Sequence, residues 1–571
     1  MRFVIATLLL VLSAISVVTG ILIKGPFDAA NYHKVSFHPD STYSYVIIPH
    51  QTLIAYPGEV RVQASGTKEV FYADAREQDI QDWVGTSNFV RLNLDKTTAK
   101  PDISVFTGGG EDTNPEGSDM WRNSLKVKKE LITDVAMFDD TAVLLASTGV
   151  NRAPNQITVS WQVANIINWP YVLLFGGLAL LIAALIMNYI AFRHIRRLRG
   201  PRRRLPKAPR APRYRKKQKS DVPRRGRRAI GRKVAFPATL ISLTLLTGCA
   251  PAAQTESGLE KVTVVVSDSQ LQRIVREVAS TVKTADTNRD QALLITRVAG
   301  SALETRKVQY FLQQKNKKIP ALAPVIANPI TVALPMQLSD SALGWQPRTL
   351  MVATKSDDPK VPPQMLVLQQ QSPRENYKLW YLIDLLPSDT FPTVAAQNVG
   401  ALSFDATDTF LSTKLTSLPF KYGDVLNNGN KSKFFTEFDL SSDKFYNSVS
   451  ALQKQQTADL KKTKVSIKYV HTLGNPNVIG MFTLPDEVSK GGGLVAIAVN
   501  DTSIIKPQVR GSAVSVTQLD HKILLDAPGS STGLNIVYEN QMLFFVPNAG
   551  SGEQIKLLGA TQGLLSVKKL N

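Results

Sequence analysis

Cysteine is almost missing from this chain of 571 residues, which contains only Cys249. One thiol cannot form a disulfide within the chain, and it cannot supply the several thiolates of a Cys-rich zinc site. The near absence suits a chain exported to a compartment in which free thiols oxidise. The position of the one cysteine therefore needs an explanation of its own.

Motifs of the common catalytic and nucleotide-binding sites are missing too. The sequence has no G-x-x-x-x-G-K-[ST] phosphate loop, no G-x-S-x-G nucleophile elbow, no H-E-x-x-H zinc motif and no G-x-G-x-x-G dinucleotide motif. We therefore expect no cofactor, and the sequence favours a non-catalytic protein over an enzyme.

Histidines and paired acids offer no recognisable site. Three histidines lie on different predicted elements near the N-terminus, and we expect isolated side chains there because a zinc site needs clustered ligands: His33, His38 and His50. The closest carboxylate pairs are typical of turns: Asp139-Asp140 and Asp405-x-x-Asp408. His471 and His521 have no nucleophilic cysteine to activate. We therefore expect no metal.

Acidic residues are scarce in one short stretch only. The chain has 67 Lys and Arg against 46 Asp and Glu, a net charge of +21. Residues 193–233 hold 20 of these bases and a single acid, Asp221, so this stretch alone carries +19. The nearly neutral remainder disfavours the alternative of a nucleic-acid-binding protein. We expect no nucleic-acid partner.

Two apolar stretches are long enough to cross a membrane. Residues 1–23 predict a transmembrane signal anchor, with a cleaved signal peptide as the alternative. Residues 169–192 predict a transmembrane helix, because Trp169 and Tyr171 stand at one end and a cluster of arginines at the other. The basic stretch 193–233 is then a cytoplasmic loop that contacts anionic membrane lipids. This topology places both flanking regions outside the plasma membrane.

A third apolar stretch, 234–249, resembles the signal of bacterial lipoproteins. A basic flank precedes 13 mainly apolar residues, Val234 to Leu246, which are too few for an ordinary membrane span. Leu246, Thr247 and Gly248 then precede the sole cysteine, as in a lipobox. The resemblance implies that Cys249 is lipidated and that a peptidase cuts after Gly248. The chain would then become two proteins; the alternative is a short third membrane segment.

The first external region, 24–168, predicts an all-β domain. Runs of β-branched and aromatic residues alternate with turn signals at the spacing of a sandwich or barrel-like module. The expected strands are 43–48, 53–56, 60–64, 69–73, 89–94, 103–107, 141–146 and 156–161. One helical turn is expected at 77–83.

The second external region predicts two α+β domains, 250–412 and 413–571. The first has helices from Ser267 or Asp268 and over 289–311, then strands 349–353, 364–370 and 377–385. The second has a helix from Asp443, then strands 465–471, 478–484, 494–499, 514–517, 523–525, 534–547 and 554–558. Helices followed by an antiparallel sheet resemble, in each half, the cystatin-like and NTF2-like folds, whose sheet wraps a helix and leaves a cone.

Five short motifs resemble an uncharacterised family of actinobacterial membrane proteins. They are Gln78-Asp79-Ile80-x-x-Trp83, Ser118-Asp119-Met120-Trp121-Arg122, Trp345-x-Pro347-Arg348, Gly491-Gly492-Gly493-Leu494-Val495 and Phe544-Phe545-Val546-Pro547. The resemblance implies a multidomain protein with an anchored N-terminal module and a large C-terminal domain of unknown function. Some members carry a glycosyltransferase label.

Three functions remain open from the sequence. The neutral external regions and the absence of catalytic motifs favour a binding or scaffolding protein of the cell envelope, whose partners are membrane lipids and cell-wall polymer or other envelope proteins. The first alternative is an enzyme of cell-envelope glycopolymer assembly, which requires buried carboxylates in a C-terminal pocket. The second is a folding or secretion aid for exported proteins, which requires an exposed apolar groove.

Overall fold

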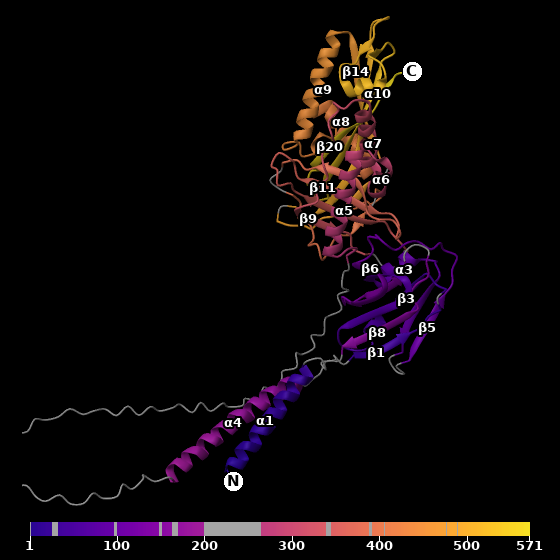
Figure 1. Cartoon of the computed structure of the whole chain (residues 1–571). Coiled ribbons are helices and arrows are strands. Elements are labelled where there is room, and N and C mark those ends of the chain that lie inside the picture. Colours follow the sequence, from indigo (N-terminus) through magenta and orange to yellow (C-terminus); the bar gives the residue numbers. More distant parts are fainter. Residues whose placement is uncertain are drawn as a thin grey trace, which may run out of the picture. The chain divides into compact units, whose positions relative to one another are not determined.

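The computed structural model describes residues 2–24, 32–40, 42–95, 100–147, 151–162, 169–198, 264–338, 344–387, 391–404, 406–475, 477–487 and 489–571. The chain divides into two compact units. One holds the two apolar helices, and the other combines residues 32–163 with residues 261–571 (Figure 1). Residues 32–163 are called the β-rich domain below, and residues 261–571 the C-terminal region. The boundaries of the membrane segments, loop and domains that the sequence predicted, from 1–23 to 413–571, stay predictions.

The unit of apolar helices is an antiparallel pair. Helix α1 (Arg2–Lys24) lies beside α4 (Trp169–Leu198) (Figure 1). The Ser13 hydroxyl donates to the Gly177 carbonyl at 2.7 Å and the Ser16 hydroxyl to the Leu173 carbonyl at 2.8 Å, so one helix ascends as the other descends. Such bonds and small contact residues hold helices together in lipid.

Small residues set the close approach of the two helices. Ala6 and Ser13 on α1, like Gly177 and Ala184 on α4, are buried and lie seven residues apart. A Cβ added at Gly177 would lie 2.6 Å from Cγ2 of Val17, so only glycine fits there. Stretches Phe3–Leu22 and Tyr171–Arg196 are long and apolar enough to cross a membrane, which agrees with the two spans predicted from the sequence. The side on which each end lies stays a prediction.

The β-rich domain is one curved sheet in the order β1-β8-β3-β7-β2-β4-β5, with β6 paired to β3. Its strands are β1 (Tyr32–Phe37), β2 (Tyr45–Ile48), β3 (Val60–Arg76), β4 (Phe89–Leu94), β5 (Pro101–Phe106), β6 (Asn123–Asp134), β7 (Thr141–Ala146) and β8 (Gln156–Gln162). Edge strands β1 and β5 approach each other, as in a partly closed barrel. Apolar clusters cover both faces of the sheet.

Some expectations for this domain were wrong in detail. The two predicted strands 60–64 and 69–73 are parts of the single strand β3, which is irregular between Ser65 and Glu69. The strand predicted at 53–56 is wrong: Leu53 ends helix α2 (His50–Leu53), whose first turn is closed by backbone bonds to the Pro49 carbonyl, and residues 54–56 form a turn. The helical turn predicted at 77–83 is confirmed, and it is part of the longer helix α3 (Glu77–Val84).

The first half of the C-terminal region contains three helices and an antiparallel sheet. Helices α5 (Asp268–Asn288), α6 (Gln291–Arg297) and α7 (Gly300–Lys315) precede the order β12-β11-β10-β9. Ser267 caps α5 in a capping box with Gln270, as the sequence predicted. The single helix expected over 289–311 is wrong: the Ala299 amide donates to Leu379 of the sheet, and Gly300 has a positive φ of 52°. The strands are β9 (Ile330–Pro335), β10 (Arg348–Thr354), β11 (Gln364–Gln370) and β12 (Lys378–Asp384).

The second half is built on a larger antiparallel sheet, in the order β13-β15-β16-β19-β20, with β14 paired to β16. Its strands are β13 (Ser403–Phe404), β14 (Val465–Leu473), β15 (Ile479–Phe482), β16 (Gly492–Pro507), β19 (Leu534–Pro547) and β20 (Lys556–Lys569), with a small pair β17 (Val514–Ser515) and β18 (Gly529–Ser530). Its helices are α8 (Leu418–Asn428), α9 (Lys444–Lys462) and α10 (Leu519–Leu525). Asp443 caps α9 as predicted. The strand predicted at 523–525 is wrong, because these residues complete α10.

The larger sheet has two different faces. One face packs on the first half, and its Leu494, Ala496, Leu543 and Phe545 belong to the core of that half. The opposite face carries Val495, Ile497 and Phe544 against α8 and α9. The two halves of the C-terminal region therefore share a core.

Candidate functional site

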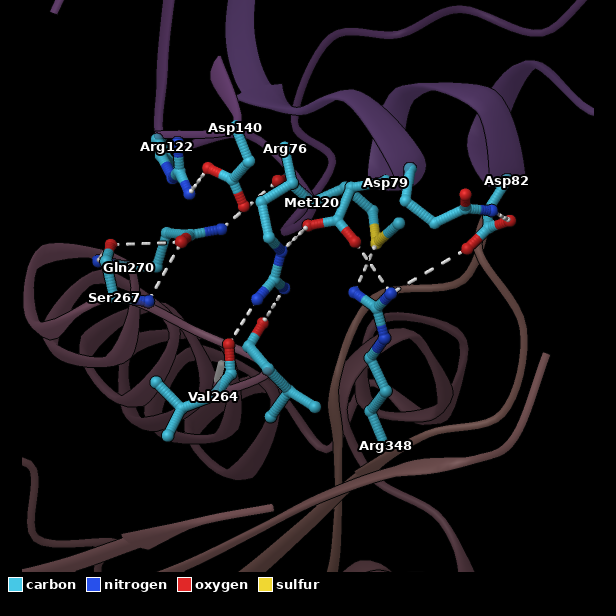
Figure 2. A network of polar contacts seen from close by, with 12 residues as sticks. Arg76, Asp79, Asp82, Met120, Arg122, Asp140, Val264, Ser267, Gln270 and Arg348 are labelled. Carbon is cyan, nitrogen blue, oxygen red and sulfur yellow. Dashed lines mark hydrogen bonds and ion pairs between the residues drawn. The ribbon is translucent and has the colours of Figure 1, made fainter. Parts of the chain in front are cut away.

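Asp79 is the centre of a charged contact between the β-rich domain and the C-terminal region (Figure 2). Its carboxylate accepts from Arg76 Nε at 2.8 Å within its own domain, and from Arg348 Nη2 at 2.7 Å across the junction. The three residues are at most 6% exposed. Burial alone would raise the pKa of Asp79, but the two guanidinium groups outweigh it and hold that pKa below its usual value.

The two arginines tie further groups into the same junction. Arg76 also donates to the backbone carbonyls of Val264 and, at 2.6 Å, Val265. Arg348 lies 3.5 Å from the Met120 sulfur and 4.2 Å from the centre of the Trp345 ring. Asp82 is a more distant partner, 3.8 Å from Arg348. These contacts satisfy donors that would be costly to bury alone.

A second buried pair joins Asp119 of the β-rich domain to Arg297 of α6. Both Asp119 oxygens accept from this guanidinium group, which also reaches Glu277 at 2.6 Å. The Tyr377 amide donates to the same carboxylate at 2.9 Å. Asp119 is 1% exposed, so it depends on these donors. A planar guanidinium with two-point contact fixes orientation as well as distance.

Arg374 forms a third connection at the end of α3. Its guanidinium group donates at 2.9 Å to the carbonyls of Trp83 and Val84, which are the last carbonyls of that helix. It donates further to the Glu111 carbonyl at 2.8 Å and to the Ser87 hydroxyl at 2.7 Å. A cation here complements the partial negative charge of a helix C-terminus.

Helix α5 holds the backbone of the segment that carries Asp119. The Gln270 amide donates to the carbonyls of Asp119 and Met120 at 3.2 and 3.1 Å. Arg273 donates to the Trp121 carbonyl at 2.6 Å. Gln270 is also the capping-box residue of α5 (Figure 2), so the same side chain caps the start of the helix and contacts the β-rich domain.

Aromatic side chains fill the junction between the ion pairs. Trp83 and Trp121 are fully buried, with ring centres 5.2 Å apart, and Tyr45 packs edge-on to Trp83. Trp345 of the C-terminal region packs against this cluster of the β-rich domain. Buried aromatic and arginine side chains are the usual anchors of protein interfaces.

This arrangement joins the β-rich domain to the C-terminal region. Its charged groups are engaged with each other, and its donors point at carboxylates and backbone carbonyls within the chain. Among the described residues, no group of three or more His, Cys, Asp or Glu side chains is placed to hold a metal ion. The geometry is that of a preformed, charge-complementary docking interface.

The motifs found in the sequence meet in two places. Those that contain Asp79, Asp119 and Arg348 come together at the junction. The other two lie on neighbouring strands: Gly492 is opposite Pro547 and Val495 is opposite Phe544. A Cβ at Gly493 would lie 2.4 Å from Phe404, so this glycine makes room for an aromatic ring.

Several residues of the junction had no signal in the sequence. Arg273, Arg297 and Arg374 stand in no motif, since a lone arginine on a helix or turn is usually a solvated side chain. The segment from Asp119 to Trp121 was noticed only as part of a resemblance. Its partners became evident from the fold alone, because they are more than 145 residues away.

The remaining sequence-based candidates lie apart from the junction. Leu246, Thr247, Gly248 and Cys249 are outside the described residues, as are most of 193–233 and all of 234–249. The histidines have separate surroundings: the His33 ring centre lies 3.9 Å from that of Tyr56 with the rings tilted, His50 contacts the Thr141 carbonyl, His471 lies 3.4 Å from Asp501, and His521 bonds to Tyr538. Asp140 pairs with Arg122, and Asp405 is outside the described part.

Fold and site together define a chain with two apolar helices and mixed α/β parts, in which a β-rich domain is docked on a larger C-terminal region. This chain belongs to the family described as "Domain of unknown function (DUF8094)", whose model matches residues 262–566. The match covers the C-terminal side of the junction, and the β-rich domain lies before it. No curated protein and no solved structure matches the chain. The actinobacterial source and the glycosyltransferase label stay predictions.

Proposed function

We propose that this protein is a non-catalytic scaffold of the cell envelope, in which a membrane-anchored β-rich domain holds the DUF8094 domain. The observation that carries the proposal is the buried junction of Asp79 with Arg76 and Arg348, and of Asp119 with Arg297. Buried pairs of this kind fix one relative orientation, and the loss of one partner is costly. The aromatic anchors around them give the contact its affinity.

The proposal includes a place in the membrane. The antiparallel pair of α1 and α4 puts the start of the chain and the arginines after residue 192 at the same end of the pair. The positive-inside rule then supports a cytoplasmic position for that end, and a position outside the plasma membrane for both folded parts. Membrane lipids are the first partners, and cell-wall polymer or other envelope proteins are the second.

The fold of the C-terminal region is part of the proposal. Each half has helices followed by an antiparallel sheet, which supports a relation of both halves to the cystatin-like and NTF2-like folds. In such folds the sheet curves around a helix, and the space between them is available for a ligand. This architecture suits a binding protein as well as an enzyme.

The acidic cavity of the C-terminal region gives little support to the alternative of an enzyme. A cavity of about 520 Å³ is lined by Asp439, Asp486 and Glu553. None of these carboxylates is buried, and they hold nearby turns: Glu553 accepts from the Ser489 hydroxyl at 2.8 Å and Asp439 from the Ser441 hydroxyl at 2.6 Å. Carboxylates with such structural partners favour the scaffold over an enzyme of glycopolymer assembly.

The contacts of the junction predict whether the two products of lipoprotein processing stay together. If a peptidase cuts after Gly248, we expect the two products to remain one complex, because the contacts of the junction do not depend on the connection between them. With a tag at each end of the chain, a blot should show two fragments for the wild type and one full-length band for Cys249→Ala. Pull-down through the N-terminal tag should retain the C-terminal fragment.

Separate outcomes bear on the two parts of this proposal. A single full-length band for both the wild type and Cys249→Ala would rule out processing and leave the scaffold in place. Two fragments that part during a mild pull-down would contradict the scaffold itself.

A further inference from the structure

A cleft lies on the larger sheet of the C-terminal region, between α9 and α10. Its volume is about 320 Å³, and strands β14, β16 and β19 form its floor. Helices α9 and α10 and strand β14 are labelled near one end of the C-terminal region in Figure 1. Helix α9 contributes Gln456, Asp459 and Leu460, and α10 contributes His521. This is the space that a sheet curved around a helix is expected to leave. Its size is at the lower end of that of small-molecule sites.

The floor of the cleft is apolar. Three isoleucines from neighbouring strands point to the same face: Ile467, Ile505 and Ile536. Ile467 is directly opposite Ile505. Ile536 is opposite Ser503, which lies two residues before Ile505 on the same strand and so shares its face. Val514 and Val516 close one side and are buried. A floor of this kind binds a hydrocarbon ring or chain by removing it from water.

One polar pair reaches into this apolar space. His521 Nε2 lies 2.7 Å from the Tyr538 hydroxyl, and both side chains line the cleft. Burial lowers the pKa of His521, so its ring is neutral at pH 7. Burial, with Asp520 and Asp501 nearby, raises the pKa of Tyr538 to about 12, so its hydroxyl keeps the proton. The pair can therefore offer one hydrogen bond to a neutral oxygen.

The charges around the cleft argue against an anionic ligand. Asp459 is the only carboxylate among the lining residues that the structure describes, and no lysine or arginine is among them. Asp459 is paired with Lys462 at 2.8 Å on the exposed face of α9. An anion would thus enter without a cation to receive it, whereas a neutral molecule has no such cost.

We propose that this cleft binds a small neutral molecule with an apolar ring or chain and a single hydroxyl or carbonyl group, which the His521–Tyr538 pair recognises. The hydrocarbon part lies on the isoleucine floor, and the oxygen faces the pair. This site is independent of the junction, because it lies on the face of the sheet opposite to the first half. It adds a ligand to a protein whose scaffold role does not require one.

The test uses phenol and benzene as probes for the full-length protein in lipid nanodiscs. Phenol is neutral at pH 7 and carries one hydroxyl, and benzene has the same ring without it. Ligand-observed saturation-transfer NMR should detect both with the wild type. Val516→Phe fills the cleft and should abolish the signal of both. Tyr538→Phe should weaken the binding of phenol about fivefold, which corresponds to the loss of one hydrogen bond, and should leave the binding of benzene unchanged.

Two further variants keep the test decisive. Gln456→Trp covers the cleft from the exposed surface of α9 without touching the core, so it should block phenol even if Val516→Phe fails to fold. Tyr446→Phe removes a tyrosine hydroxyl outside the cleft and should change nothing. Equal phenol signals in wild type and Gln456→Trp would overturn the site. Equal phenol affinities in wild type and Tyr538→Phe would overturn recognition by the polar pair.

Discussion

Replacing Asp79 with asparagine is expected to destabilise the junction by about 3–5 kcal/mol, the usual cost of removing one partner from a buried ion pair. The variant keeps the shape of the side chain but leaves Arg76 and Arg348 facing each other, with only the more distant carboxylate of Asp82 near Arg348. Neither guanidinium group can reach water, because both are nearly fully buried. The effect should therefore far exceed that of an exposed pair.

The measurement is denaturant unfolding of the full-length protein, followed by tryptophan fluorescence, to which Trp83 and Trp121 in the junction contribute. Asp134→Asn is the control, since Asp134 forms a similar two-point contact with Arg61 but is 62% exposed. This control should cost less than about 1 kcal/mol. Equal losses for the two variants would mean that Asp79 does not hold the junction.

The same carboxylate predicts resistance to mild acid. A carboxyl group with a pKa below its usual value contributes stability that is present above its unfolded-state pKa and is lost as the pH falls through the lowered folded-state pKa. The contribution of Asp79 should thus persist at pH 5 and disappear only in stronger acid. The difference in stability between wild type and Asp79→Asn should accordingly be nearly constant from pH 7 to pH 5.

Glu539→Gln is expected to act in the opposite direction and to stabilise the protein at alkaline pH. Burial, with Glu304 nearby, raises the pKa of Glu539 from its usual value of 4.5 to about 7. Glu539 stands on the face of β19 that packs against α7, and it is 4% exposed. The folded protein therefore prefers the protonated carboxyl group.

The sign of the effect follows from linkage. A raised folded-state pKa gives stability that is complete below pH 4.5 and is lost as the pH rises through about 7. Glutamine keeps the uncharged state at every pH. At pH 8 the free energy of unfolding of the variant should exceed that of the wild type by about 3 kcal/mol, and the two should agree near pH 4.5.

Thermal unfolding between pH 5 and pH 8.5 measures this difference. Other groups titrate over the same range, but they are common to both proteins and cancel in the comparison. Glu375→Gln is a suitable control, because Glu375 is exposed, pairs with Lys378 and does not act on Glu539. A gap between Glu539→Gln and wild type that stays the same at pH 5 and pH 8 would show that Glu539 does not bind a proton in the folded state.

The sequence predicted many local elements because their signals are local. Strands β4, β7, β11 and β19 lie where alternating or continuous apolar runs placed them, and the caps of α5 and α9 follow from Ser267 and Asp443. The break before α7 could not be foreseen, because it depends on a hydrogen bond from Ala299 to Leu379 in a strand 80 residues later. Residues 523–525 have the apolar run of a strand, yet they complete helix α10 over the end of the sheet.

The sequence predicted some residues of the candidate site, but it did not predict that they come together. The motifs around Asp79, Asp119 and Arg348 stood out in the sequence, but nothing local says that an aspartate will face an arginine 269 residues away. Arg297 and Arg374 acquire their roles from docking alone. The cleft is a similar case, since His521 and Tyr538 become partners only after α10 folds over the sheet.

The central claim is that the junction, and not the connecting stretch, holds the two folded parts together. A protease site inserted between Glu256 and Ser257 of a Cys249→Ala chain lets the purified protein be cut after its last apolar stretch. Size-exclusion chromatography of the cut protein in detergent should then show residues 257–571 eluting with the membrane-anchored part, and Asp79→Asn should release them. Elution of residues 257–571 as a separate species from the cut chain with Asp79 intact would contradict the claim.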